Sequence, residues 1–143
     1  MKRILLLSFV VCFLLTSVLL AFDYPNIIGE WIGSSYGHGN VIMDDSDEVV
    51  YYDGRGLDNV HFHILEQEGR IFWGVKMVFN VNGDLVREEG FSGLFKKDSN
   101  HFHILEHHDG LCNGELISDN EMEIIYTENV TYPLMLIYEL KRK

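Results

Sequence analysis

The stretch IFWGVKMVFNVNGDL, residues 71 to 85, decides the fold. Its apolar side chains recur at every second position from Ile71 to Val81, which is the period of a β-strand whose alternate side chains share one face. Asn82-Gly83-Asp84 follows, and an Asn-Gly pair between two β-rich runs predicts a tight hairpin. The stretch therefore predicts two neighbouring antiparallel strands.

Short β-rich runs separated by turn clusters continue along the rest of the chain. Short connections favour antiparallel neighbours, and closing a twisted sheet of this size removes its exposed edges. We predict an all-β fold, a single antiparallel up-and-down β-barrel of about eight or nine strands, with a β-sandwich as the alternative. The expected strands are 27–36, 49–52, 60–66, 71–81, 85–95, 101–107, 111–117, 122–127 and 134–140.

Residues 1–22 differ in character from the rest. Lys2 and Arg3 precede an uncharged apolar run over 4–22, a pattern typical of a secretory signal helix. Cleavage near Ala21 or Phe22 would give a secreted or cell-surface protein. The alternative is a retained membrane anchor formed by residues 4–22, because the run approaches the roughly 20 residues that span a bilayer. The expected domains are therefore a signal peptide or anchor, 1–22, and one barrel domain, 23–143.

The charge of the exported part limits its partners. Without Lys2 and Arg3 it carries nine Lys and Arg against 22 Asp and Glu, a net charge of −13. Such a domain offers no basic stripe for nucleic acid or for an anionic membrane, so we expect membrane contact only through an uncleaved N-terminal segment. Only Cys112 remains after cleavage, so an internal disulfide is excluded and the hydrophobic core must supply the stability.

Two motifs at the ends of the expected barrel resemble those of the calycins, the superfamily of lipocalins, fatty-acid-binding proteins and avidins. Gly29-Glu30-Trp31 is a G-x-W near the start of the domain, and Arg142 lies in the last strand. The resemblance implies that Trp31 plugs one end of the barrel and that Arg142 covers its ring, a favourable cation–π arrangement.

Longer runs are similar to those of small exported prokaryotic proteins with lipocalin-like or avidin-like barrels. The shared pattern is G-x-W-x-G at 29–33, Q-x-G-R-x-F-x-G at 67–74, F-x-G at 91–93 and Y-x-E at 126–128. This resemblance covers almost all of residues 23–143 and implies the fold and export. It transfers no activity, since those proteins have none that is settled.

The word HFHILE occurs twice, at 61–66 and 101–106, which indicates a copied strand. Alternation places the histidines of each copy opposite Phe and Ile, so we expect the histidines to face solvent. A histidine-lined lumen is one alternative. A zinc-type site completed by His107 or Glu66 is the other. The alternative metal ligands are His61, His63, His101 and His103.

The expected function is that of a non-enzymatic binding module for a small apolar or amphipathic ligand, without cofactor or catalytic residues. The F-x-G units leave room beside a large ring, either for a neighbouring ring or for a ligand. The alternative is a cell-envelope interaction or structural protein with a side-chain-filled barrel, which a cavity below a few hundred cubic ångströms would favour. The candidate ligand contacts are Tyr36, His38, Phe72, Asn80 and Phe91.

Four weaker features complete the sequence-based expectations. Asn129-Val130-Thr131 is a glycosylation sequon, with Asn129 as the acceptor. The acidic run 44–48 is expected to be a solvated loop rather than a calcium site. Glu106 and Asp109 are interpreted as turn residues, and Cys112 as a packed core cysteine.

Overall fold

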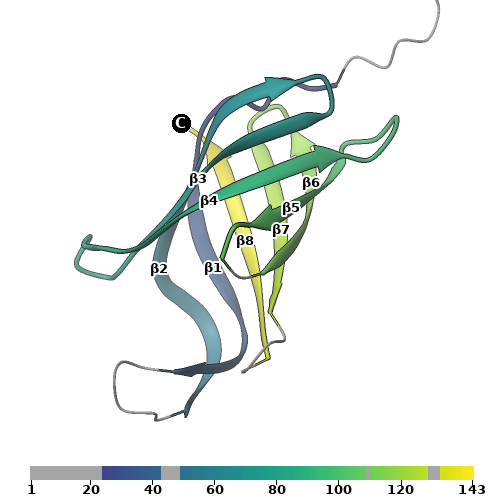
Figure 1. The fold of residues 1–143 in the computed structure, drawn as a ribbon. Coiled ribbons are helices and arrows are strands. Elements are labelled where there is room, and N and C mark those ends of the chain that lie inside the picture. The colour runs from purple at the N-terminus through teal and green to yellow at the C-terminus, as the bar shows by residue number, and fades with distance from the viewer. Residues whose placement is uncertain (1–23, 43–48, 109, 129–132) are drawn as a thin grey trace, which may run out of the picture.

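The strands form one closed antiparallel barrel in the computed structural model, which describes residues 24–42, 49–108, 110–128 and 133–143 (Figure 1). Each strand pairs with the next, and β8 closes the barrel against β1. The predicted up-and-down β-barrel is therefore confirmed, and the sandwich alternative is wrong. The strands are β1 (Gly29–Ile42), β2 (Val49–Glu68), β3 (Ile71–Phe79), β4 (Leu85–Phe95), β5 (His101–Glu106), β6 (Leu111–Ser118), β7 (Glu121–Glu128) and β8 (Leu134–Arg142).

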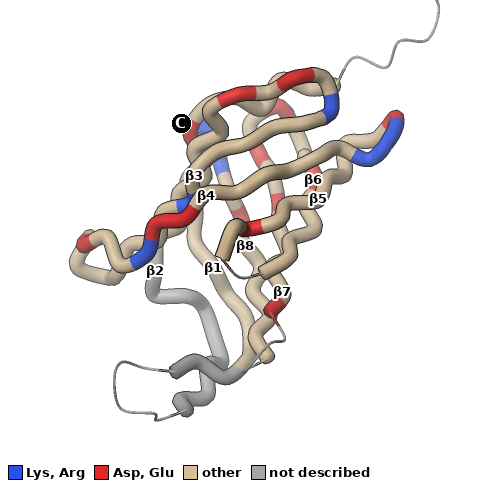
Figure 2. The backbone as a smooth tube through the Cα atoms, viewed as in Figure 1, with Lys and Arg blue, Asp and Glu red and all other residues tan. Residues whose placement is uncertain are grey.

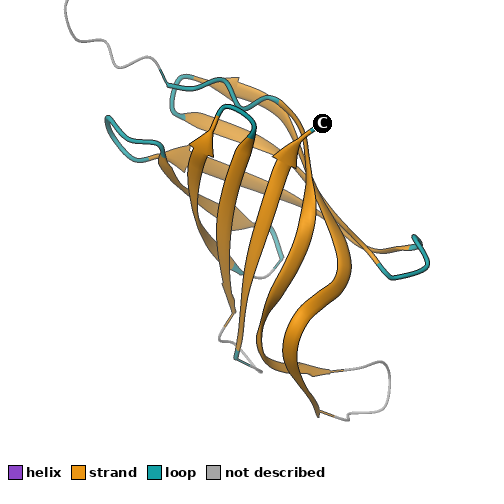
Figure 3. Ribbon diagram, turned by 180° about the vertical axis from the view of Figure 1, so that it is seen from behind, coloured by secondary structure: helices purple, strands orange, loops and turns teal. Residues whose placement is uncertain are grey.

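The β3–β4 hairpin turns at the predicted Asn-Gly pair. The side-chain oxygen of Asn80 accepts hydrogen bonds from the backbone N–H groups of Asn82 and Asp84, both at 2.9 Å. Gly83 has a φ of 86°, a conformation that glycine adopts without steric penalty. The hairpin projects away from the body of the barrel in both ribbon views (Figures 1 and 3).

The second strand is longer than the sequence predicts. The expected strands 49–52 and 60–66 are parts of the single strand β2, so eight strands form where nine runs are expected. Backbone pairing with β1 continues through the intervening turn-like residues, including Tyr36 with Arg55 and Gly37 with Gly54. Pairing with a long partner strand overrides the local turn preference of Asp53-Gly54.

Aromatic rings that lie against glycines of neighbouring strands fill the half of the barrel that contains Trp31. This half is called the closed half below. A Cβ added to Gly93 would come within 2.2 Å of the Phe72 ring, and one added to Gly114 within 2.1 Å of Phe102. The F-x-G units therefore make room for a neighbouring ring, which was one of the two expected uses of the glycine. The buried rings of this half are Trp31, Phe62, Phe72, Phe91, Phe95 and Phe102.

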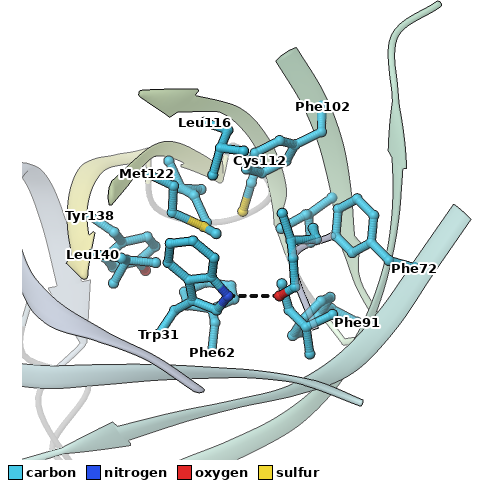
Figure 4. Close-up of a cluster of buried hydrophobic side chains, with 14 of the residues drawn as sticks. Trp31, Phe62, Phe72, Phe91, Phe102, Cys112, Leu116, Met122, Tyr138 and Leu140 are labelled. Atoms are coloured by element: carbon cyan, nitrogen blue, oxygen red, sulfur yellow. Dashed lines mark hydrogen bonds between the residues drawn. The ribbon is translucent and has the colours of Figure 1, made fainter. Parts of the chain in front are cut away.

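Trp31 closes the end of this aromatic core (Figure 4). Its side chain is fully buried, and its indole N–H donates a hydrogen bond to the carbonyl of Ile27 at 2.8 Å. The Arg142 guanidinium lies 4.9 Å from the centre of the indole ring and donates to the carbonyls of Asn26 and Ile28. This is the arrangement that the calycin resemblance implies.

The segment before β1 is held against the closed end by side-chain contacts. The Gln67 side chain accepts a hydrogen bond from the Ile27 N–H and donates one to the Pro25 carbonyl. Arg70 donates twice to the Phe95 carbonyl. The Q-x-G-R run therefore has a structural role at this end of the barrel.

Several sequence-based predictions fall on residues that the structure does not describe. These are the apolar segment 1–22, the acidic run 44–48, Asp109 and the acceptor Asn129 of the sequon. Within the described ranges, no helix has the length and apolar character needed to cross a membrane.

Trp31→Ala is expected to reduce the free energy of unfolding by about 3–5 kcal/mol, because it removes the largest fully buried side chain and its hydrogen bond. Chemical denaturation of both proteins measures the difference. Trp73→Ala is the matched control, since Trp73 is only partly buried on the outer face of β3. An equal loss in both variants would contradict the role of Trp31 as the plug.

Candidate functional site

A group of charged side chains lies inside the barrel beside the aromatic core. Alternation along β3 places Phe72, Gly74 and Lys76 on its inner face. Lys76 therefore enters the interior, where its side chain is only 3% exposed. A buried ammonium group needs compensating charge, and the neighbouring strands β4 and β5 supply it.

Two carboxyl groups contact the Lys76 amine. Glu89 lies directly opposite Lys76 in the β3–β4 register, with its Oε1 2.7 Å from the Lys76 Nζ. The Lys76 Nζ also donates a hydrogen bond to Oε2 of Glu106, from β5. The side chains of Glu89 and Glu106 are 1% and 0% exposed. Lys76, Glu89 and Glu106 are called the buried triad below.

Arg87 extends the triad toward the end of the barrel opposite Trp31, which is called the open end below. Its Nε lies 3.1 Å from Oε1 of Glu89, while its side chain remains 42% exposed. That Glu89 oxygen lies between the two cations without a well-directed hydrogen bond, so its contacts are ionic. In Figure 2 the acidic stretch of β4 lies beside β3 where the hairpin leaves the barrel.

The two HFHILE copies place their glutamates differently. In β2 the pairing with β3 shifts between Ile64 and Glu66, so Leu65 is an extra residue and Glu66 is exposed. In β5 the pairing is regular, and Glu106 remains on the inner face with Ile104. The interpretation of Glu106 as a turn residue is therefore wrong. A β-bulge redirects the following side chain, and only the first copy has one.

Burial and charge set the protonation of the two carboxyl groups. Burial raises the pKa of Glu106 to about 7, although Lys76 acts in the opposite direction. Burial also acts to raise the pKa of Glu89, but contacts with Lys76, Glu106 and Arg87 outweigh it, and the pKa is lowered. Glu106 is therefore the carboxyl that holds a proton more readily. Lys76 and Glu89 are the side chains that act on the Glu106 pKa. The Glu106 charge in turn acts to raise the pKa of Arg87, Cys112, Tyr126 and Tyr138.

Cysteine and tyrosine side chains surround the triad. The Cys112 thiol donates a hydrogen bond to Oε1 of Glu106 at 3.5 Å, and burial raises the thiol pKa, so it remains protonated. The Tyr126 ring lies 5.0 Å from the Lys76 Nζ, and its hydroxyl donates to Glu128. The packed cysteine expected from the sequence is confirmed.

A small cavity lies on the side of the triad that faces away from Trp31. Its volume is about 140 Å³, which is below the roughly 300 Å³ of the smaller ligand pockets in proteins. Polar and charged groups of the triad region meet aliphatic side chains there. The lining residues are Ser35, Val60, Lys76, Val78, Arg87, Tyr126, Leu134, Leu136 and Tyr138.

The structure does not bring the five predicted ligand contacts to this cavity. Phe72 and Phe91 are fully buried in the aromatic core, and Asn80 holds the β3–β4 turn. Inner positions of β1 include Trp31 and Ser35, so Tyr36 and the exposed His38 lie on its outer face.

The histidines of both HFHILE copies lie on the outer face, as the solvent-facing prediction expects. His101 is exposed, while His61, His63 and His103 are partly buried. The His61 ring lies against Phe79, with 4.7 Å between ring centres. Across the described ranges, no group of three or more His, Cys, Asp or Glu side chains could hold a metal ion.

A second notable feature is an apolar area on the outer face of β2 to β6. Ile71 pairs with Leu94, and Leu105 pairs with Leu111, so their side chains form neighbouring apolar pairs. Leu105 is 60% exposed, and the partly buried Trp73 adjoins the area. We call these residues the apolar band: Leu65, Ile71, Trp73, Leu94, Leu105 and Leu111.

Sequence reasoning missed Lys76, Glu89 and Glu106 as a group. The alternation of β3 already places Lys76 on one face with Phe72 and Gly74, so a charged residue at an inner position was visible. Its partners could not be assigned, because the register between β4 and β5 and the bulge in β2 depend on contacts distant in sequence.

Lys76→Met is expected to make stability fall as pH rises, because Glu106 then has no contact with the Lys76 ammonium. The folded-state pKa of Glu106, already about 7 with Lys76 present, lies above its ordinary value of 4.5. Folding therefore favours protonated Glu106, a contribution present below pH 4.5 and lost as pH rises through the folded-state pKa, which lies higher still once the lowering contact with Lys76 is removed. The loss is roughly 3 kcal/mol, from 1.36 kcal/mol per pKa unit.

Denaturation midpoints at pH 5 and pH 8 provide the measurement. The double variant Lys76→Met/Glu106→Gln is the control, because it has no carboxyl at position 106 and should lack this decrease. A Lys76→Met protein that gains stability between pH 5 and pH 8 would contradict the assignment.

A scan against protein-family models gives no match to this chain, and a search of curated proteins gives none.

Proposed function

We propose that the protein is a non-enzymatic interaction module whose outer barrel surface binds a partner protein. The observation that carries this proposal is the filling of that part of the barrel interior whose side chains the structure describes, which leaves out those of residues 40–58. Aromatic rings occupy the closed half, the buried triad lies next to them, and the described cavity has a volume of about 140 Å³. Among these described side chains there is little room for a carried lipid, so the surface of the barrel is the better candidate for binding.

The apolar band is the surface that best fits such a role. Scattered exposed apolar residues are ordinary, but neighbouring ones on adjacent strands are a feature of interaction sites. Ile71, Leu94, Leu105 and Leu111 are all substantially exposed and lie on four successive strands. An aromatic residue, Trp73, adjoins them, and aromatic residues are enriched in the centres of protein interfaces.

The charge around the band points to the chemistry of the partner. Glu66, Glu68 and Glu115 are exposed on the strands that carry the band, and they outnumber the exposed Arg70, whose guanidinium donates to the Phe95 carbonyl. An apolar surface bordered by basic residues would complement it, because charge complementarity favours the correct partner. If the apolar segment 4–22 directs export, that partner is a protein of the cell envelope or of the medium.

The test uses the double variant Leu94→Lys/Leu105→Lys in the full chain. Chemical cross-linking in the producing cells, followed by mass spectrometry, should capture a specific protein with the wild type and much less of it with the variant. Ile117→Lys is the control, since Ile117 is equally exposed but lies outside the band. Equal capture by both variants would contradict the proposal.

A second candidate function is supported by the cavity itself. Arg87 and the aliphatic side chains Val60, Val78 and Leu136 meet there, as a small amphipathic molecule with an acidic group requires. The volume corresponds to about four or five water molecules at ~30 Å³ each, so only a compact ligand fits. A thermal-shift screen of short-chain carboxylates should then give a hit that Arg87→Ala abolishes. A screen without a hit would contradict this second function, and the interaction module would then be the single remaining proposal.

A further inference from the structure

The buried triad places a primary amine in contact with a carboxyl group inside the protein. The Lys76 Nζ donates a hydrogen bond to Oε2 of Glu106, and the Glu89 Oε1 lies 2.7 Å from the same nitrogen. All three side chains are at most 3% exposed. They come from three successive strands, so the barrel fixes their relative positions.

This environment favours reaction between the amine and the acid. Holding two reacting groups in contact replaces a bimolecular encounter, which is equivalent to a very high effective concentration. Exclusion of water favours the uncharged amine and acid, which are the reactive forms, over the ion pair. Burial raises the pKa of Glu106 to about 7, so part of this carboxyl is protonated near neutral pH.

We propose that Lys76 and Glu106 condense to an intramolecular isopeptide bond, with Glu89 transferring the proton. A proton first moves from the Lys76 Nζ to Oε2 of Glu106 along their hydrogen bond. The Nζ lone pair then attacks the Glu106 Cδ, and the Glu89 carboxylate accepts a proton from Nζ. Glu89 returns that proton to the departing hydroxyl. The Nζ–Cδ bond forms, the Cδ–Oε2 bond breaks, one water leaves, and no redox partner is required.

Neighbouring side chains fit the needs of this reaction. The Cys112 thiol donates a hydrogen bond to Oε1 of Glu106, the oxygen on which negative charge develops during the attack. The Tyr126 ring lies 5.0 Å from the Lys76 Nζ and restricts the position of the amine. Glu89 contacts the attacking nitrogen and is also fixed by Arg87. Contacts with Lys76, Glu106 and Arg87 lower the pKa of Glu89 against the effect of burial, which favours the ionised carboxylate that accepts a proton.

The bond would connect strands that do not pair with each other. Lys76 is in β3 and Glu106 is in β5, with β4 between them. The cross-link would therefore enclose residues 76–106 and join β3 to β5 across the intervening β4. Like a disulfide, it would restrict the unfolded chain. Cys112, the single cysteine of the described residues, is free, so this part of the chain has no disulfide that does the same.

Mass spectrometry of the full-length wild-type protein provides the test. After its N-terminus is assigned, the intact mass should be lower by one water, about 18 Da, than the mass of the unmodified chain. Trypsin should release a branched peptide that joins residues 71–87 to residues 98–141, because acylated Lys76 is no longer cleaved. A full intact mass, with cleavage after Lys76 and an unmodified Glu106 peptide, would overturn the proposal.

Three variants separate the chemistry from folding. Lys76→Arg keeps the positive charge but cannot form the amide, so it should have the unmodified mass. Glu89→Gln removes the proton acceptor and should accumulate the uncross-linked chain, whereas full cross-linking would overturn the role of Glu89. Glu106→Gln can only condense with loss of ammonia, about 17 Da, so any product identifies position 106 as the acceptor. The wild-type mass decides the proposal even where a variant fails to fold.

Discussion

The packing of aromatic rings against glycines is the constraint on which the structure depends. An eight-stranded barrel has an interior just wide enough for side chains to fill it. Phe72 lies against Gly93 and Phe102 against Gly114, so the rings occupy space that any larger residue at these positions would require. Because of this packing, Trp31 closes one end of the barrel against a continuous cluster of buried side chains.

The polar interior follows from the same limited space. Beyond the aromatic half, the inner positions of β3, β4 and β5 hold Lys76, Glu89 and Glu106 instead of further apolar side chains. Their charges compensate one another at short range, as buried charges in proteins must. The barrel thus has an aromatic closed half, a charged middle and a small cavity toward the open end, and each of these regions makes different chemistry available.

The sequence predicts the fold well and the site poorly, for a physical reason. Period-two alternation and the Asn82-Gly83 turn are local signals, and they correctly predict the β3–β4 hairpin and the strands from β3 onward. They miss that the runs 49–52 and 60–66 form the single strand β2. Whether Glu66 and Glu106 are exposed or buried is not decided by local sequence. The two identical HFHILE segments place their glutamates differently because Leu65 bulges against β3, whereas Leu105 pairs regularly with β6. The triad and the cavity depend on such registers, which a single sequence does not specify.

The contacts at the closed end bring the two ends of the described chain together. Arg142 binds the carbonyls of Asn26 and Ile28, and the Lys143 N–H donates to the Glu30 carbonyl. A short designed linker could therefore join residue 143 to residue 24, and new termini could be opened in the exposed turn at Asn82-Gly83. Such a circular permutant would keep every strand pairing. It would lose only the covalent connection between β3 and β4. It would make the projecting hairpin an attachment point for a fused domain or a fluorescent label.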